Sequence, residues 1–513
     1  MDDRLRAVCT LFMPSVREEG GVHDYDGTIS DLSPAGVSRA LAGLGGEPYP
    51  DPAIEAHVTA FENFARVWFG DLQFHRRNPD VHLRNMNLML YERGYAPAEE
   101  RRQARNRQLA LWPDAVDMAV QALDQVPQRT AAALIGSARA LANQISQSDP
   151  DEHVAERARQ AIARLSAHLE TAAAEGNPDS AIGGENLAAL MTAAESLSFN
   201  LDQMRDTASS EIARLTAIMT AACKRIDPHA EPAGILRKLL ADRPATNEEI
   251  IANAWSVTQD LRAFCRERDL MPYHDGDLEM GLDADAQGLF IANLRPCAPE
   301  EAECESTYHL TPPDWSWPQQ QINQWLQKFC PTIIGAISAH EVAPGHFLHF
   351  RAIRHATGLA RRILQSYTFA EGWGHYAEEV CVEEGFRAND PRFEIGMCLE
   401  ALARVVRLAS AIGLHTGEMT PEDSSRMFIQ LAHMSAATAR HEANRGLFDP
   451  MYGRYTWGKL VIKDIRRRAQ DAWGSGYSLP RFHREILALG CPPIGLLNSV
   501  LHDEQPRHSM NQR

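Results

Sequence analysis

The amino-acid sequence predicts a mainly α-helical protein with a small β hairpin or sheet. Two observations predict the helices. Long segments rich in Ala, Glu, Arg and Leu carry apolar residues every three to four positions, and short polar breaks separate these segments. A third observation predicts the sheet, because the region from Met271 to Pro313 loses the helical spacing and gains Gly, Pro and Asp.

The predicted helices are clearest between residues 151 and 226. Asp151–Gly176 and Asn186–Ile226 both repeat the apolar spacing, and the stretch "GNPDSAIGG" separates them. In the region without helical spacing, "GLFIANL" (Gly288–Leu294) and "STYHLTP" (Ser306–Pro312) are typical of short strands. A short edge strand there could hold an extended peptide by backbone hydrogen bonds.

The length of 513 residues allows one very large domain or two to three ordinary ones. We place a soft boundary in "DPHAEPAG" (Asp227–Gly234), which gives an N-terminal helical subdomain (1–234) and a C-terminal subdomain that carries the chemistry (235–513). One interleaved fold is equally compatible with the sequence.

Charge and cysteine content narrow the class of protein. The formal net charge of −17 argues against a nucleic-acid partner, which needs a basic surface, and against an anionic membrane. The start lacks the features of a signal peptide, and no segment approaches the ~20 apolar residues of a transmembrane helix. The nine cysteines form no C-x-x-C pair, and Cys297 and Cys304 are too far apart for a zinc knuckle. We therefore expect reduced thiols and a cytoplasmic location.

The stretch "SAHEVAPGHFLHF" carries an altered zinc-peptidase motif. His340 and Glu341 begin an H-E-x-x-H pattern, but Pro344 stands where the second histidine belongs, and His346 comes two residues later. On an ideal helix, ~100° per residue puts His346 ~120° away from His340. Proline breaks the helix and Gly345 permits unusual dihedrals, so the Pro-Gly pair could turn His346 toward His340.

A catalytic zinc site needs three protein ligands and one open position. Glu371, in "YTFAEGWGHYAEEV", follows His346 by 25 residues, which allows a turn and a returning helix. We predict zinc ligands at His340, His346 and Glu371, with Glu341 as the general base. Manganese, iron or cobalt would also accept these ligands.

The combination of H-E-x-x-P-G-H with E-G-W-x-x-Y-A-E resembles a widespread bacterial family classed as a domain of unknown function. That family is similar, at a distance, to the gluzincin metallopeptidases, such as thermostable carboxypeptidase and angiotensin-converting enzyme. The resemblance extends along most of the chain, from "NPDVHLRNMNLML" to "LPRFHREILALGCPPIGLL". It implies an all-α, gluzincin-like peptidase fold with the zinc site in a deep cleft.

The resemblance also implies roles for further residues. Tyr455, in "GRYTWGK", matches a tyrosine that could hydrogen-bond a developing oxyanion. His415 matches a histidine in a G-L-H segment that could bind substrate, although the aspartate common before that segment is missing here. His375 replaces a residue that is more often aliphatic in the family, and it could act as a partner of the ligands, a substrate contact or an extra ligand.

Two arginines that follow the E-G-W-x-x-Y-A-E motif are further candidate site residues. Arg404 and Arg407 lie three residues apart on a predicted helix, a spacing typical of a salt-bridged face. They could also clamp a substrate carboxylate.

We therefore expect a zinc hydrolase, monomeric or homodimeric, that cleaves an amide bond in a short peptide or peptide-like small molecule. An alternative is a metal-dependent enzyme of specialised amino-acid or natural-product metabolism. A second alternative is a non-catalytic binding protein that kept the fold, although the intact Glu341 speaks against it.

Overall fold

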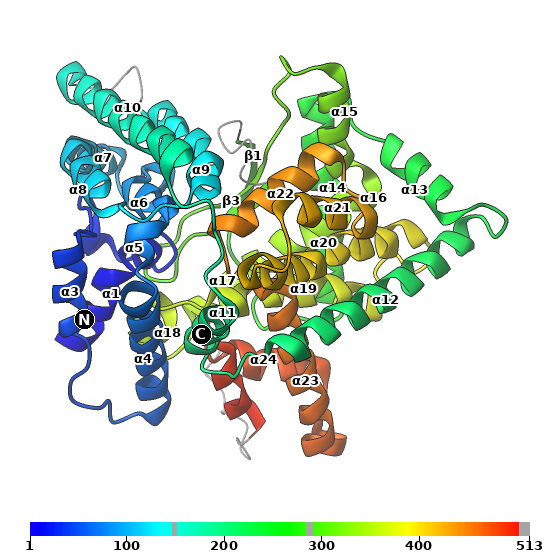
Figure 1. Ribbon diagram of the computed structural model, residues 1–513. Coiled ribbons are helices and arrows are strands. Elements are labelled where there is room, and N and C mark those ends of the chain that lie inside the picture. The colour runs from blue at the N-terminus through cyan, green and yellow to red at the C-terminus, as the bar shows by residue number, and fades with distance from the viewer. Residues whose placement is uncertain (146–150, 284–290, 502–513) are drawn as a thin grey trace.

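The computed structural model describes residues 1–145, 151–283 and 291–501. The fold is mainly α with one small sheet, as predicted. Figure 1 shows the N-terminal helices, blue to cyan, on one side of the molecule and most later helices, green to orange, on the other. The N-terminal helices are α1 (Asp3–Leu11), α2 (Met13–Glu18), α3 (Pro34–Ala42), α4 (Pro52–Ala65), α5 (Phe74–Arg77), α6 (Pro79–Met86), α7 (Ala98–Ala110), α8 (Trp112–Ala122), α9 (Gln128–Ala140) and α10 (Glu152–Glu175).

The later helices form the larger part of the structure. Before the sheet lie α11 (Gly184–Glu195), α12 (Leu201–Ile226), α13 (Pro232–Ala241) and α14 (Asn247–Glu267). After the sheet lie α15 (Gln319–Leu326), α16 (Pro331–Glu341), α17 (His346–Arg354), α18 (Leu359–Ile363), α19 (Tyr367–Glu383), α20 (Pro391–Thr416), α21 (Pro421–Leu431), α22 (Ala436–Phe448), α23 (Arg454–Trp473) and α24 (Leu479–Leu487).

The first predicted long helix is confirmed as α10, and the second is divided. Asp151 caps α10 by accepting hydrogen bonds from two backbone amides of the first turn. The predicted helix over 186–226 breaks between α11 and α12, where Ser196 adopts a left-handed conformation (φ 49°). Asn200 then caps α12 by accepting from the Gln203 amide. Apolar spacing alone did not reveal this break, because the spacing resumes after it.

The small sheet has the strand order β1-β3-β2. Its strands are β1 (Leu278–Leu282), β2 (Ala292–Arg295) and β3 (Ser306–Leu310). β3 pairs in parallel with β1 and antiparallel with β2. The predicted strand at 306–312 is confirmed, and the one at 288–294 is confirmed from residue 292, since residues 288–290 lie outside the described residues. β1 was not predicted, because its Gly281 and acidic neighbours resemble a loop.

β2 is an edge strand, and its register with β3 shows which of its backbone groups point away from the sheet. The Thr311 amide donates to the Ile291 carbonyl, which makes these two residues a hydrogen-bonded pair. Because such pairs alternate along antiparallel strands, the amide and carbonyl of Leu294 point away from β3. The predicted edge strand is therefore present, and its backbone groups that do not pair with β3 point outward.

The main hydrophobic core crosses the boundary that we placed near residue 234. It contains buried residues from Leu72 to Val500, including Leu215 and Met219 of α12 together with Leu402 and Val406 of α20. A separate core joins α6 to α10, and the first helices pack against α18. The shared core favours the interleaved form of the fold, and the division at 234 stays a prediction.

Candidate metal centre

The candidate metal centre begins where the helix that carries His340 is interrupted. α16 ends one residue after His340, and α17 begins at His346. The cis peptide bond Ala343–Pro344 and Gly345 lie between the two helices. The predicted break is thus confirmed, and the two imidazole ring centroids lie 4.6 Å apart. The altered motif turns His346 back toward His340.

Glycine is required at position 345 because the chain doubles back closely there. A Cβ atom on Gly345 would lie 1.8 Å from the His340 carbonyl oxygen. The Gly345 amide donates to the Ala339 carbonyl at 3.0 Å. The Trp373 indole N–H donates to the Pro344 carbonyl at 2.9 Å, which ties the break to α19.

Glu371 completes the group from the second turn of α19. Ser366 caps this helix by accepting from the Phe369 amide. The Glu371 Oε2 atom lies 3.2 Å from Nε2 of His340 and 3.4 Å from Nε2 of His346. The three ligand atoms all lie within 4.8 Å of one another. Two imidazole nitrogens and one carboxylate oxygen are a donor set that zinc accepts with a position left open, so these residues fit the predicted metal.

Two glycines of the E-G-W-G sequence let α19 approach its neighbours. A Cβ on Gly374 would lie 2.6–2.9 Å from atoms of the His340 ring, and a Cβ on Gly372 would lie 2.6 Å from the backbone of Gly458 in α23. The first contact brings α19 against the metal-site histidine. The second brings α23, which begins next to Tyr455, against the same helix.

Glu378 contacts His340 on the side of the ring that faces away from Glu371. It was not predicted as a site residue. Its Oε1 accepts from His340 Nδ1 at 2.8 Å, which leaves Nε2 free to act as a ligand. Arg404 donates to Glu378 Oε2 at 3.0 Å, and both side chains are buried. Arg404 thus contacts the ligand-supporting carboxylate. The sequence contained a signal for Glu378, because this residue lies seven positions after Glu371 and therefore on the same face of the predicted helix.

The histidines and carboxylates of the site shift one another's pKa values. Burial and Arg404 oppose the charged imidazole, but Glu371 and Glu378 outweigh them and raise the pKa of His340. Burial likewise opposes the charged form of Glu371, yet His340 and His346 hold the pKa of its carboxyl well below the usual value. The two histidines thus stabilise the ionised form of Glu371.

Glu341 is half-buried at the end of α16 and accepts a hydrogen bond from the Leu294 amide of the edge strand. Burial raises the pKa of its carboxyl to about 7, and the charge of Glu371 adds to this shift. His346, Arg404 and the outward-pointing amide of Leu294 act in the opposite direction. A carboxyl group with this pKa can both take up and release a proton near neutral pH.

Tyr455 contacts the metal-site carboxylate directly. Its hydroxyl donates to Glu371 Oε1 at 3.1 Å and accepts from Arg445 at 3.3 Å. Burial raises the pKa of Tyr455, so the hydroxyl keeps its proton. The Arg407 guanidinium lies 4.9 Å from the Tyr455 ring centroid and forms an ion pair with Glu442. Arg407 thus packs against the tyrosine ring and is already paired.

Neither His375 nor His415 belongs to the converging ligand group of the described residues. His375 is buried one turn after Glu371, and its Nδ1 lies 3.9 Å from Glu378. His415 is buried near the end of α20, where its Nε2 lies 2.8 Å from the Gly446 carbonyl oxygen. His375 therefore lies next to Glu378 and outside the candidate ligand group, and His415 makes its hydrogen bond to the backbone of α22.

The fold and the site define a mostly helical protein with a His-His-Glu candidate metal centre beside a small sheet. Over residues 50–501 the chain matches the family described as "Bacterial protein of unknown function (DUF885)", and it belongs to that family. A comparison with curated proteins finds no match. A relationship to gluzincin peptidases stays a prediction.

Two solved structures share the fold. One is titled "putative lipoprotein of unknown function" from Shewanella oneidensis, with a TM-score of 0.75 and 16% identity over 97% of each chain. The other, a "putative lipoprotein" from Colwellia psychrerythraea, has a TM-score of 0.77 and the same identity and coverage. In the described part of this chain, no helix is long and apolar enough to cross a membrane. The description as lipoproteins belongs to those two proteins, and a cytoplasmic location of this protein stays a prediction.

Proposed function

We propose that this protein is a zinc-dependent hydrolase that cleaves an amide bond in a short peptide or peptide-like small molecule. The observation that carries the proposal is the convergence of His340, His346 and Glu371, with Glu341 beside them. These three would hold the ion. A bound zinc ion would polarise the amide carbonyl and lower the pKa of a water molecule.

The other residues around the centre support the steps of such a reaction. Glu341 is placed to take a proton from the attacking water and to pass it to the leaving amine, which needs a carboxyl that titrates near neutral pH. Tyr455 keeps its proton, and when a substrate binds it could turn this proton from Glu371 to the carbonyl oxygen as negative charge develops there. The Leu294 carbonyl, which also points away from β3, could accept a hydrogen bond from an extended backbone next to Glu341.

The test is turnover of a panel of dipeptides and N-acyl amino acids by wild type and by Glu341→Gln. We expect at least one amide to be hydrolysed, and the substitution to lower kcat by about 10²–10⁴-fold with the metal content unchanged. Equal turnover by both proteins would contradict the mechanism. Turnover of many unrelated dipeptides would exclude the specialised metabolic enzyme, whereas the non-catalytic alternative requires no turnover of any amide.

A further inference from the structure

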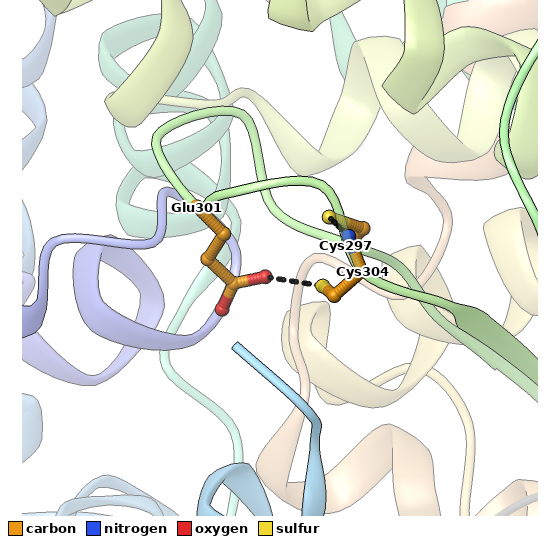
Figure 2. A group of neighbouring side chains, drawn as sticks. All are labelled: Cys297, Glu301 and Cys304. Atoms are coloured by element: carbon orange, nitrogen blue, oxygen red, sulfur yellow. Dashed lines mark hydrogen bonds between the residues drawn. The ribbon is translucent and has the colours of Figure 1, made fainter. Parts of the chain in front are cut away.

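A second group of metal-binding side chains lies outside the candidate active site. Cys297, Glu301 and Cys304 each offer one ligand atom, and these atoms all lie within 4.8 Å of one another. Figure 2 shows the three side chains on one loop, with the Glu301 carboxylate facing the Cys304 sulfur. The loop connects β2 to β3. The C-x6-C spacing excludes a zinc knuckle, but the loop folds back and brings the two sulfurs together.

Hydrogen bonds within the loop fix the positions of the two sulfurs. The Cys304 amide donates to the Cys297 sulfur at 3.2 Å, and the Cys297 amide donates to Ser306 Oγ at 2.9 Å. Arg354 donates to the backbone carbonyls of Ala298 and Glu301 at 2.8 and 2.6 Å. The arrangement of ligands is therefore held by the protein itself, which lowers the entropy cost of binding an ion.

Glu301 is oriented so that one of its oxygens faces the sulfurs. Its Oε1 is held by Arg93 and lies 3.1 Å from Nε2 of His23. Its Oε2 accepts from the Ala298 amide at 2.6 Å and lies 3.6 Å from the Cys304 sulfur, which donates to it. His23 and Arg93 thus position the carboxylate in the way that outer-shell partners orient metal ligands.

We propose that Cys297, Cys304 and Glu301 form a second binding site for a thiophilic divalent cation such as zinc. Two thiolates favour soft or borderline ions, and the half-exposed Cys304 leaves a fourth position for water. On binding, the ion replaces the proton that Cys304 shares with Glu301, and each thiol releases one proton to solvent.

The surrounding charges suit this ion. Two thiolates and one carboxylate around a divalent cation leave one net negative charge. Arg93 contacts Glu301, and an Arg354 nitrogen lies 3.7 Å from the Cys297 sulfur, so positive groups compensate that charge. Such an ion would fix the connection between β2 and β3, and Glu301 links this connection through His23 to the N-terminal helices.

The test is cobalt(II) titration of the full-length, metal-depleted protein, followed by absorption spectroscopy. Thiolate ligands give cobalt a strong charge-transfer band in the near ultraviolet, which a His-His-Glu site does not give. We expect this band in wild type and in His346→Ala, and its loss in the double variant Cys297→Ser/Cys304→Ser. Glu301→Gln should weaken cobalt binding about 10–100-fold, while Glu305→Gln, an exposed neighbour on the same loop, should leave it unchanged.

Alkylation of the wild-type protein provides a readout that does not depend on the variants folding. Zinc should protect Cys304 from iodoacetamide by at least tenfold, measured by peptide mass spectrometry. Absence of both the band and the protection would overturn the proposal, and so would a Cys297–Cys304 disulfide in protein purified without oxidant. Because His346→Ala removes only the other centre, failure of this site and failure of the proposed hydrolase are distinguishable.

Discussion

At the scale of single residues, the candidate metal ligands are held in place by hydrogen bonds with a second set of side chains. A hydrogen bond from Nδ1 of His340 would orient its Nε2 atom toward a metal ion, and Glu378 accepts that hydrogen bond at 2.8 Å while Arg404 holds Glu378 in place. Glu371 is held in a similar way by Tyr455 at 3.1 Å. Both candidate ligands are therefore held by residues outside the predicted ligand set.

Glu378→Gln tests this dependence. An amide can still occupy the position, but it no longer attracts the Nδ1 proton as strongly, so zinc affinity should fall about 10–100-fold. Competition with a chelator of known affinity measures the change, and circular dichroism verifies the fold. Glu384→Gln, near the end of α19, is the control and should bind zinc as wild type does. Unchanged affinity in both variants would show that Glu378 does not support the ligand.

At the scale of elements, glycines determine how closely α19 approaches the histidine motif. A Cβ on Gly374 would lie within 3 Å of the His340 ring. Gly374→Ala should therefore displace the ring and lower zinc affinity by at least tenfold. Gly136→Ala in α9, where nothing lies within 4 Å, should instead stabilise the protein by roughly 0.5–1 kcal/mol. Equal zinc affinity in both variants would contradict the packing argument.

The contact between α20 and α22 includes an ion pair between Arg407 and the buried Glu442, and its contribution to stability depends on pH. Burial alone would raise the pKa of Glu442, but Arg407 dominates and lowers it from 4.5 to about 2. Because the folded pKa is depressed, the stabilising effect is complete above pH 4.5 and is lost as the pH falls toward 2.

Glu442→Gln should accordingly cost on the order of 3 kcal/mol of unfolding free energy at pH 6, and this cost should shrink as the pH falls below 4.5. Urea unfolding at several pH values measures it. Glu422→Gln removes an exposed pair with Arg129 and should cost less than about 1 kcal/mol. A cost for Glu442→Gln that stays constant from pH 6 to pH 3 would contradict the assignment.

The sequence predicted some elements well and others poorly, for physical reasons. Local patterns were enough for α10, for β3 and for the break at Pro344, because each depends on spacing or on proline chemistry within a few residues. The break at Ser196 was missed because the apolar spacing resumes after it, and β1 was missed because Gly281 and its acidic neighbours resemble a loop. Glu378 lies on the same face of α19 as Glu371, but its contact with His340 is made across two helices. The Cys297–Cys304 contact depends on how a loop folds back, which spacing along the chain does not reveal.

At the scale of the whole molecule, the main core unites residues on both sides of position 234. α12 packs against α20, and their buried residues belong to one cluster. We therefore expect the fragments 1–234 and 235–513, expressed separately, to lack cooperative thermal unfolding, whereas the full chain shows it. Calorimetry of the three proteins decides this. A cooperative transition in either fragment alone would contradict this expectation.

The central claim is that His340, His346 and Glu371 hold a metal ion. The most direct test is the metal content of wild type and His346→Ala by mass spectrometry, with both proteins purified without chelators or a histidine tag. We predict one divalent ion fewer per chain in the variant, with the fold unchanged by circular dichroism. Equal metal content in the two proteins would contradict the claim.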